Sequence, residues 1–146
     1  MLVCKQGLLQ PAASALAELC TRKTDLEPLR PGTNAWVIDT GSGYNLVARH
    51  NVDNAQHIIR AKTPLTLLTA NGVTESHEYV VVNIPVLNIR TEAWILENTP
   101  LVLSVNKLVR DHGCEFAWKR PHVAQLQRGS KRIALQVAQG VPVLRV

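Results

Sequence analysis

Short apolar segments alternate with polar or glycine-containing turns along most of the chain. Residues 35–38 are apolar, residues 39–43 form a polar turn sequence that contains two glycines, and residues 44–47 return to apolar character. Apolar runs of this length, bounded by turn-forming residues, are typical of buried strands. The pattern therefore predicts a mostly β protein whose first two strands flank the turn at residues 39–43.

The same pattern predicts a series of strands downstream. The first covers residues 65–69 and is followed by Asn71-Gly72, the dipeptide most typical of a tight hairpin. The second covers residues 79–84, and Pro85 limits its extension because proline cannot donate a backbone hydrogen bond. Turns are also expected at Arg128-Gly129 and Gln139-Gly140. The predicted strands cover residues 65–69, 79–84, 91–96, 101–103, 115–118, 123–126, 133–137 and 141–144.

One or two short helices are expected beside the strands. Residues 11–20 begin with proline and are rich in helix-forming residues, which favours a helix, and residues 24–32 then read as a connector. Ser104 is well suited to cap a helix over residues 105–112, and Gly113 to end it. The predicted class is mostly β with short helices.

The composition supports a folded chain the size of one domain. The 146 residues are 46% hydrophobic and 18% charged, which excludes a disordered or collagen-like protein, and the 4% aromatic content indicates an aliphatic core. No apolar run approaches the roughly 18 residues that a membrane span needs, and the first residues lack the apolar region of a secretion signal. We expect a soluble, cytoplasmic protein with no membrane partner.

Cysteine and histidine are arranged in ways that argue against a metal centre. Cys4, Cys20 and Cys114 are odd in number and widely spaced, and no Cys-x-x-Cys motif occurs. The five histidines also lack the spacing of metal ligands. The sequence therefore predicts reduced thiols, no disulfide framework, no metal site and no cofactor.

Charge is distributed unevenly along the chain. The net charge is +5, but residues 1–100 contain 8 Lys or Arg against 9 Asp or Glu, whereas residues 101–146 contain 8 against 2. Such a basic segment is typical either of a nucleic-acid contact or of a solvated edge. Because many of its cations lie beside predicted turns, we favour the solvated edge, with nucleic acid as the less favoured partner.

Asp39 is the strongest candidate for chemistry. A carboxylate at the end of an apolar strand is costly unless neighbouring groups stabilise it, and backbone N–H groups near Gly41 and Ser42 can do so. The absence of a Cβ atom at Gly41 lets the chain approach closely. Such a carboxylate can activate water, but peptide hydrolysis needs both a base for the water and an acid for the leaving nitrogen.

The triplet Asp39-Thr40-Gly41, which follows two apolar residues, resembles the catalytic triplet of aspartic proteases from retroviruses and retrotransposons. Residues 101–108, Leu-Val-Leu-Ser-Val-Asn-Lys-Leu, are similar to the copia-type retrotransposon segment in which Leu-Ser-Val leads into a short helix. Ser104 departs there from the Ile-Leu-Gly of retroviral enzymes. Residues 69–72, Thr-Ala-Asn-Gly, resemble another copia-type segment. Taken together, these motifs extend the resemblance over residues 34–118.

The resemblance implies a retropepsin-like fold, a closed β-barrel or sheet domain that functions as a twofold dimer. In that fold Asp39 would be the catalytic residue. Thr40 would hydrogen-bond to the loop of the partner subunit, Gly41 would permit the turn, and Ser42 would orient the carboxylate from outside. These three residues would therefore support the catalytic loop.

Two further segments acquire roles from the same resemblance. A hairpin would supply the flap that closes over an extended peptide substrate and adds main-chain hydrogen bonds to it. The segment that leads into the short helix would form a second motif. The residues of the predicted flap are Thr69, Ala70, Asn71 and Gly72, and those of the second motif are Leu103 and Ser104.

The triplet occurs once in the sequence, so a working site would need two copies of Asp39 related by a twofold axis. Two carboxylates a few ångströms apart cannot both ionise. The pair would therefore share one proton, with one carboxylate acting as base and the other as acid.

The resulting prediction divides the chain into three regions: a helical arm and connector at 1–33, a retropepsin-like protease domain at 34–118, and a basic β extension at 119–146 packed on the same domain. The implied function is an aspartic endopeptidase that cleaves the polyprotein of its own retrotransposon as a homodimer, in the cytoplasm or in retroelement particles. Two alternatives stay open: a non-catalytic dimer that binds extended peptides, and a basic nucleic-acid-binding domain.

Overall fold

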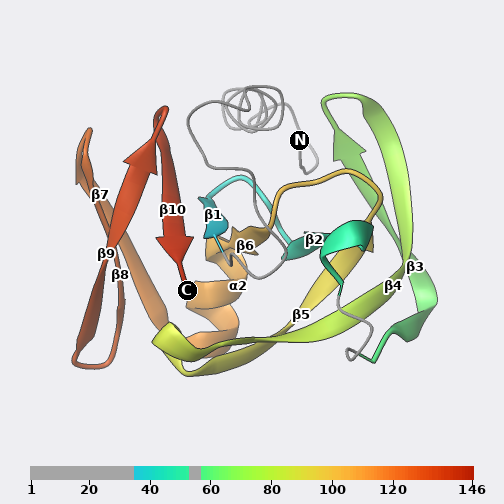
Figure 1. Ribbon diagram of the computed structural model, residues 1–146, viewed down its shortest axis with the longest axis horizontal. Helices are drawn as coiled ribbons and strands as arrows, with labels where there is room; N and C mark the ends of the chain where they lie inside the picture. The colour runs from blue at the N-terminus through green and yellow to red at the C-terminus, as the bar shows by residue number, and fades with distance from the viewer. Residues whose placement is uncertain (1–34, 53–56) are drawn as a thin grey trace.

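The computed structural model describes residues 35–52 and 57–146, in which ten strands form one sheet (Figure 1). The predicted helix at 11–20, the connector at 24–32, Cys4 and Cys20 lie outside the described residues. The strands are β1 (Ala35–Asp39), β2 (Leu46–Ala48), β3 (Ile59–Thr69), β4 (Gly72–Ile84), β5 (Ile89–Leu96), β6 (Val102–Ser104), β7 (Cys114–Arg120), β8 (Val123–Arg128), β9 (Lys131–Ala138) and β10 (Val141–Arg145). One α-helix, α2 (Val105–His112), and two 3-10 turns, η1 (Arg49–Asn51) and η2 (Pro85–Leu87), complete the described elements.

The predicted mostly β class is confirmed, but the predicted closed barrel is wrong. The strand order is β3-β4-β5-β2-β6-β1-β10-β9-β8-β7, so β3 and β7 are the two ends of the sheet and do not pair with each other. Figure 1 shows the β3–β4 hairpin and the β7–β9 strands on opposite sides of the molecule. Because β3 and β7 lie at opposite ends of this order, the sheet is open.

The three central strands are buried on both faces. β1 pairs in parallel with β6, and β2 pairs in parallel with β5 and contacts β6. Ile38 and Leu103 enter the larger core cluster, whereas their neighbours Val37 and Val102 enter a smaller cluster. Because successive strand residues point to opposite faces, this arrangement requires apolar residues at every position. It explains the uninterrupted apolar runs in the sequence.

The β3–β4 hairpin is longer than the sequence pattern predicted. β3 begins at Ile59 rather than at residue 65, and β4 begins at Gly72 rather than at residue 79. Most side chains in the added segments are exposed or half-buried, so they leave no apolar alternation to detect. The predicted turn is confirmed with a shift of one position: Thr69 pairs with Gly72, which leaves Ala70-Asn71 as the two-residue loop.

The predicted helix at residues 105–112 is confirmed together with both of its caps. The Ser104 hydroxyl accepts a hydrogen bond from the backbone N–H of Lys107 at 3.2 Å, which satisfies one of the free donors at the helix start. Gly113 ends the helix with a φ of 64°, a conformation that glycine adopts without strain. α2 thereby follows directly from β6.

The C-terminal strands continue the sheet next to the strand that carries Asp39. β10 pairs with β1, with Val37 opposite Val143, and β9, β8 and β7 follow in order. The Arg128 guanidinium donates hydrogen bonds to the carbonyls of Leu87 and Asn88, and also to that of His112 at 3.2 Å. At least one cation of the basic segment is therefore used to hold the end of β8 against η2 and α2.

Candidate functional site

Asp39 is the last residue of β1, at the centre of the sheet. In the parallel pairing of β1 with β6, Asp39 lies opposite Ser104. It follows four buried apolar residues and is itself only 4% exposed, although its side chain is a carboxylate. A buried carboxylate of this kind needs hydrogen-bond donors, and the loop that begins at residue 40 supplies them.

The two oxygens of the Asp39 carboxylate have different surroundings. Oδ1 accepts a hydrogen bond from the backbone N–H of Gly41 at 2.7 Å, as the sequence predicted. Oδ2 is buried and has no hydrogen-bond partner among the described residues. Burying an acceptor without a partner is unfavourable, so Oδ2 is a position where a further donor would be bound strongly.

Burial raises the pKa of the Asp39 carboxyl above its ordinary value, because the ionised form loses its hydration. The backbone N–H groups of Gly41 and Ser42 oppose this effect by stabilising the carboxylate, but the pKa remains raised. The protonated form of Asp39 is therefore accessible at a higher pH than in an exposed aspartate. A buried carboxyl with a raised pKa can keep its proton where an exposed aspartate is ionised, which suits acid–base chemistry.

The loop after Asp39 is closed by bonds of its own. The Ser42 hydroxyl donates to the carbonyl of Tyr44 at 2.6 Å and accepts from the N–H of Tyr44 at 3.2 Å, so it bonds within the loop. Gly41 and Ser42 are buried, whereas Thr40 is exposed. The loop thus holds the carboxylate inside and presents the threonine side chain outside.

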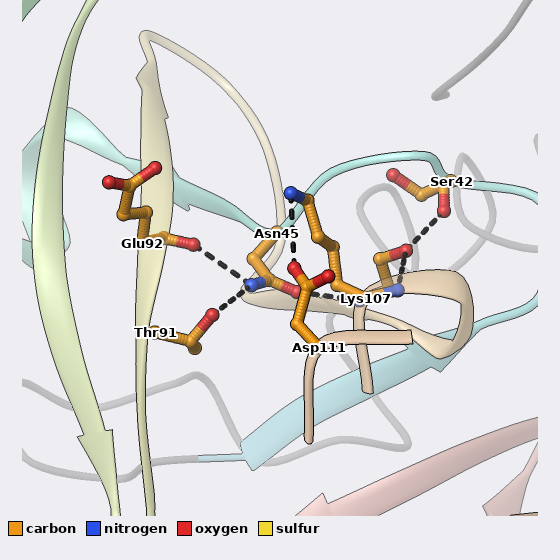
Figure 2. A network of polar contacts seen from close by, with 7 residues as sticks. Ser42, Asn45, Thr91, Glu92, Lys107 and Asp111 are labelled. Carbon is orange, nitrogen blue, oxygen red and sulfur yellow. Dashed lines mark hydrogen bonds and ion pairs between the residues drawn. The ribbon is translucent and has the colours of Figure 1, made fainter. Parts of the chain in front are cut away.

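The second predicted motif lies directly against this loop. The Ser104 hydroxyl donates to the Ser42 carbonyl at 2.5 Å while accepting from Lys107, so it links the loop to the first turn of α2 (Figure 2). The preceding residue, Leu103, is fully buried in the larger core cluster. The structure therefore brings residues 39–42 and 103–104 together, although Ser42 and Ser104 are 62 positions apart in the sequence.

Asn45 is the functional candidate that the sequence analysis missed. Its side chain is 2% exposed, and its Oδ1 accepts the backbone N–H of Ser104 at 2.9 Å. Its Nδ2 donates to the carbonyl of Glu92 at 2.8 Å and to the hydroxyl of Thr91 at 3.0 Å (Figure 2). The available signal was a single amide inside the apolar run at 44–47, because a buried polar residue there needs partners.

The predicted flap residues lie away from Asp39 in the single chain. Thr69 and Asn71, at the tip of the β3–β4 hairpin, help to line a half-open groove of about 580 Å³. Its other wall is formed by residues 95–99, which are the end of β5 and the segment that follows it, and the residues of the Asp39 loop do not line it. The structure thus joins Asp39 with the second motif, and the hairpin tip with the 95–99 segment, as two separate groups.

Within residues 35–52 and 57–146, no three His, Cys, Asp or Glu side chains are close enough together to hold a metal ion. Cys114 is a buried free thiol. Burial raises the pKa of that thiol above its ordinary value, which favours the unreactive form. None of the described helices is long and apolar enough to cross a membrane.

Comparisons with known proteins found no significant relative of this chain. The chain matches no family model, and neither the curated proteins nor the solved structures include a significant match. The functional argument therefore depends on the residues and contacts described above.

Proposed function

We propose that the chain is an aspartic endopeptidase of the retrotransposon type, active as a homodimer in which each subunit contributes one Asp39 carboxylate. Its substrate would be an extended peptide segment of a polyprotein. The observation that carries the proposal is the unequal state of the two Asp39 oxygens: Oδ1 is held by Gly41, and Oδ2 is buried with no partner among the described residues.

A second carboxylate is the group that the site lacks for peptide hydrolysis. Asp111 is the other described aspartate, and its carboxylate lies 3.3 Å from the Lys107 ammonium on the surface of α2. The described part of one chain therefore offers Asp39 no aspartate as a partner. A second copy related by a twofold axis would supply an identical group.

In such a pair the raised pKa of Asp39 has a direct use. One proton would be shared between the two carboxylates, because two adjacent negative charges repel each other. The ionised carboxylate would take a proton from water as the water oxygen attacks the peptide carbonyl carbon. The protonated carboxylate would supply the proton that the nitrogen needs when the carbon–nitrogen bond breaks.

Two further features support this reading. Thr40 is exposed beside the buried carboxylate, where it can bond to a partner subunit. The groove between the hairpin tip and residues 95–99 is separate from Asp39 in the single chain, but its volume of about 580 Å³ leaves room for an extended segment. Asp39 is only 4% exposed in the single chain, so the proposal requires that the residues covering Oδ2 move aside when the two carboxylates come together.

Subunit mixing tests the shared site. Asp39→Asn should fold but be inactive, because an amide cannot share the proton. With three mutant chains per wild-type chain and time for exchange, activity should fall to about a quarter of that expected from independent sites, since random pairing leaves few wild-type dimers. Activity per chain should also fall on dilution, and it should be highest on the acid side of neutral.

Asp111→Asn is the matched control, because it removes a surface aspartate outside the loop and should not suppress the wild-type chain. Activity strictly proportional to the amount of wild-type chain, in the presence of excess Asp39→Asn and on dilution, would contradict the shared site. A wild-type chain that binds extended peptides and cleaves none would favour the non-catalytic dimer instead.

A further inference from the structure

The buried side chain of Asn45 joins three elements that surround the Asp39 loop. Its Oδ1 holds the backbone N–H of Ser104 at the junction of β6 and α2, and its Nδ2 holds Thr91 and Glu92 on β5. Its own backbone carbonyl accepts the N–H of Trp94 at 2.9 Å. Every hydrogen-bonding atom of the side-chain amide is used, which fixes its orientation.

Ser104 connects this amide to the catalytic loop. Its N–H is held by Asn45, its hydroxyl donates to the Ser42 carbonyl, and it lies opposite Asp39 in the pairing of β1 with β6. A change at Asn45 therefore reaches the Asp39 loop through one intervening residue, Ser104. Figure 2 shows the Asn45 amide between Thr91 and Glu92 of β5 on one side and Ser42 of the Asp39 loop on the other.

We propose that Asn45 is a positioning residue of the active site, which sets the place of the Asp39 carboxylate by fixing the Ser104 backbone against β5. This inference rests on the proposed protease function. Asn45 does not touch the reacting atoms in this arrangement. It acts through Ser104, whose hydroxyl in turn holds the Ser42 carbonyl and with it the loop whose Gly41 N–H orients Asp39.

The physical basis is the bond between the Asn45 Oδ1 and the Ser104 N–H, which is buried, so that water cannot replace it without opening the core; the bonds to Thr91 and Glu92 are half-buried. Removing the amide leaves the Ser104 N–H and the Glu92 carbonyl unpaired, and the loop is then free to shift until they find partners. A displacement of about 1 Å at a catalytic group costs up to about 100-fold in rate. Binding of an extended substrate depends much less on that displacement.

Asn45→Ala tests the proposal with two independent readouts in the full-length chain. The first is kinetic: kcat should fall by about 10- to 100-fold, with KM changed by less than about twofold. The second needs no activity. Carbon-13 labelling of aspartate, with Asp39→Asn for assignment, follows the titration of Asp39, which should move toward that of an exposed aspartate as the loop opens.

Leu135→Ala is the control for a loss of stability alone. Leu135 is buried on β9 in the larger core cluster and carries no polar group toward the loop. Compared under conditions where both variants are folded, Leu135→Ala should leave kcat and the Asp39 titration unchanged. If it alters both to the same extent as Asn45→Ala, the role of Asn45 is only structural and the proposal is overturned.

A double-mutant cycle identifies the route through Ser104. Ser104→Ala removes the bond to the Ser42 carbonyl, so Asn45→Ala should add little to its effect on kcat and on the titration. Fully additive losses would overturn this route. If Asn45→Ala does not fold, Thr91→Val, which removes one acceptor of the amide, should produce a smaller change of the same kind, and no change would overturn the proposal.

The two proposals can fail separately. A wild-type chain that cleaves no peptide contradicts the protease function, while the titration of Asp39 in Asn45→Ala still decides whether Asn45 positions the carboxylate. Cleavage by the wild type with an unchanged kcat and an unchanged titration in Asn45→Ala contradicts only the positioning role.

Discussion

The loop after Asp39 and the tip of the β3–β4 hairpin are both glycine-containing turns that follow a strand, but they are held in different ways. The hairpin tip is closed by local bonds: the Thr69 hydroxyl donates to the Gly72 carbonyl at 2.8 Å and accepts from the Asn71 N–H at 3.2 Å. The Asp39 loop is also held by Ser104, which lies 62 residues from Ser42 in the sequence.

This difference follows the burial of the two turns. Leu68 and Val73, which flank the tip, are 49% and 70% exposed, whereas Asp39 and Ser42 are almost completely buried. A turn in water can leave its remaining polar groups to the solvent, whereas a turn in the core needs protein partners for them, and in the Asp39 loop Oδ2 of Asp39 has none among the described residues. The buried loop therefore depends on distant residues, and the hairpin tip does not.

The largest expected contrast is in stability. Leu103→Ala should lower the free energy of unfolding by about 2–5 kcal/mol, because Leu103 is fully buried beside the loop and the change leaves a cavity. Leu68→Ala at the hairpin tip should cost less than about 0.5 kcal/mol. Urea unfolding of both variants measures the difference, and equal losses would break the comparison.

The pH dependence of stability should distinguish the buried turn in another way. Burial raises the pKa of Asp39, so the folded state holds the proton more tightly than the unfolded chain does. The favourable contribution is complete below the unfolded pKa and is lost as the pH rises through the folded pKa. Unfolding measured from pH 3 to pH 8 should therefore show this loss in the wild type and not in Asp39→Asn; identical curves would contradict it.

Replacing glycine should lower stability more at Gly72, beside the exposed hairpin tip, than at Gly43, at the end of the Asp39 loop. Gly72 has a φ of 109°, which L-residues rarely adopt, so Gly72→Ala should cost about 1 kcal/mol of stability through backbone strain. Gly43 has no such φ and open space around its Cα, so Gly43→Ala should change stability by less than about 0.5 kcal/mol. Thermal unfolding of the pair tests this order.

The smallest effect is expected where the hairpin meets the rest of the sheet. Arg49 forms ion pairs with Glu78 of β4 and with Glu97, and its side chain is 42% exposed. Arg49→Ala should therefore cost about 0.2–1 kcal/mol, and the cost should shrink at high salt. A larger loss that does not depend on salt would show that the hairpin is held as firmly as the Asp39 loop.

Much of the architecture could be predicted from local pattern. The strand before Asp39, the helix between Ser104 and Gly113, and the turn after Thr69 all agree with the structure. Each has a strong local cause, namely an apolar run, a capping hydroxyl or a turn-forming dipeptide. The early part of β3 was missed because its side chains are mostly exposed and carry no apolar alternation.

In the candidate site, too, the contacts between near neighbours were predictable and those between distant residues were not. The sequence identified Asp39 and the Gly41 N–H that holds it, because both belong to one turn. It also marked Ser104, as a helix cap, but not its bond to Ser42. Asn45 was passed over because its partners, at residues 91, 92 and 104, are distant in the chain.

By itself, the sequence determined the mostly β class, most of the strands and the hydrogen bond that holds Asp39 in its turn, because these depend on side-chain periodicity and on bonds between near neighbours. Only the tertiary structure decided that the sheet stays open, that Ser104 lies opposite Asp39 and that Asn45 ties β5 to the loop. Such contacts form when strands pair across long stretches of chain, and the choice among pairings depends on burying both faces of the central strands at once.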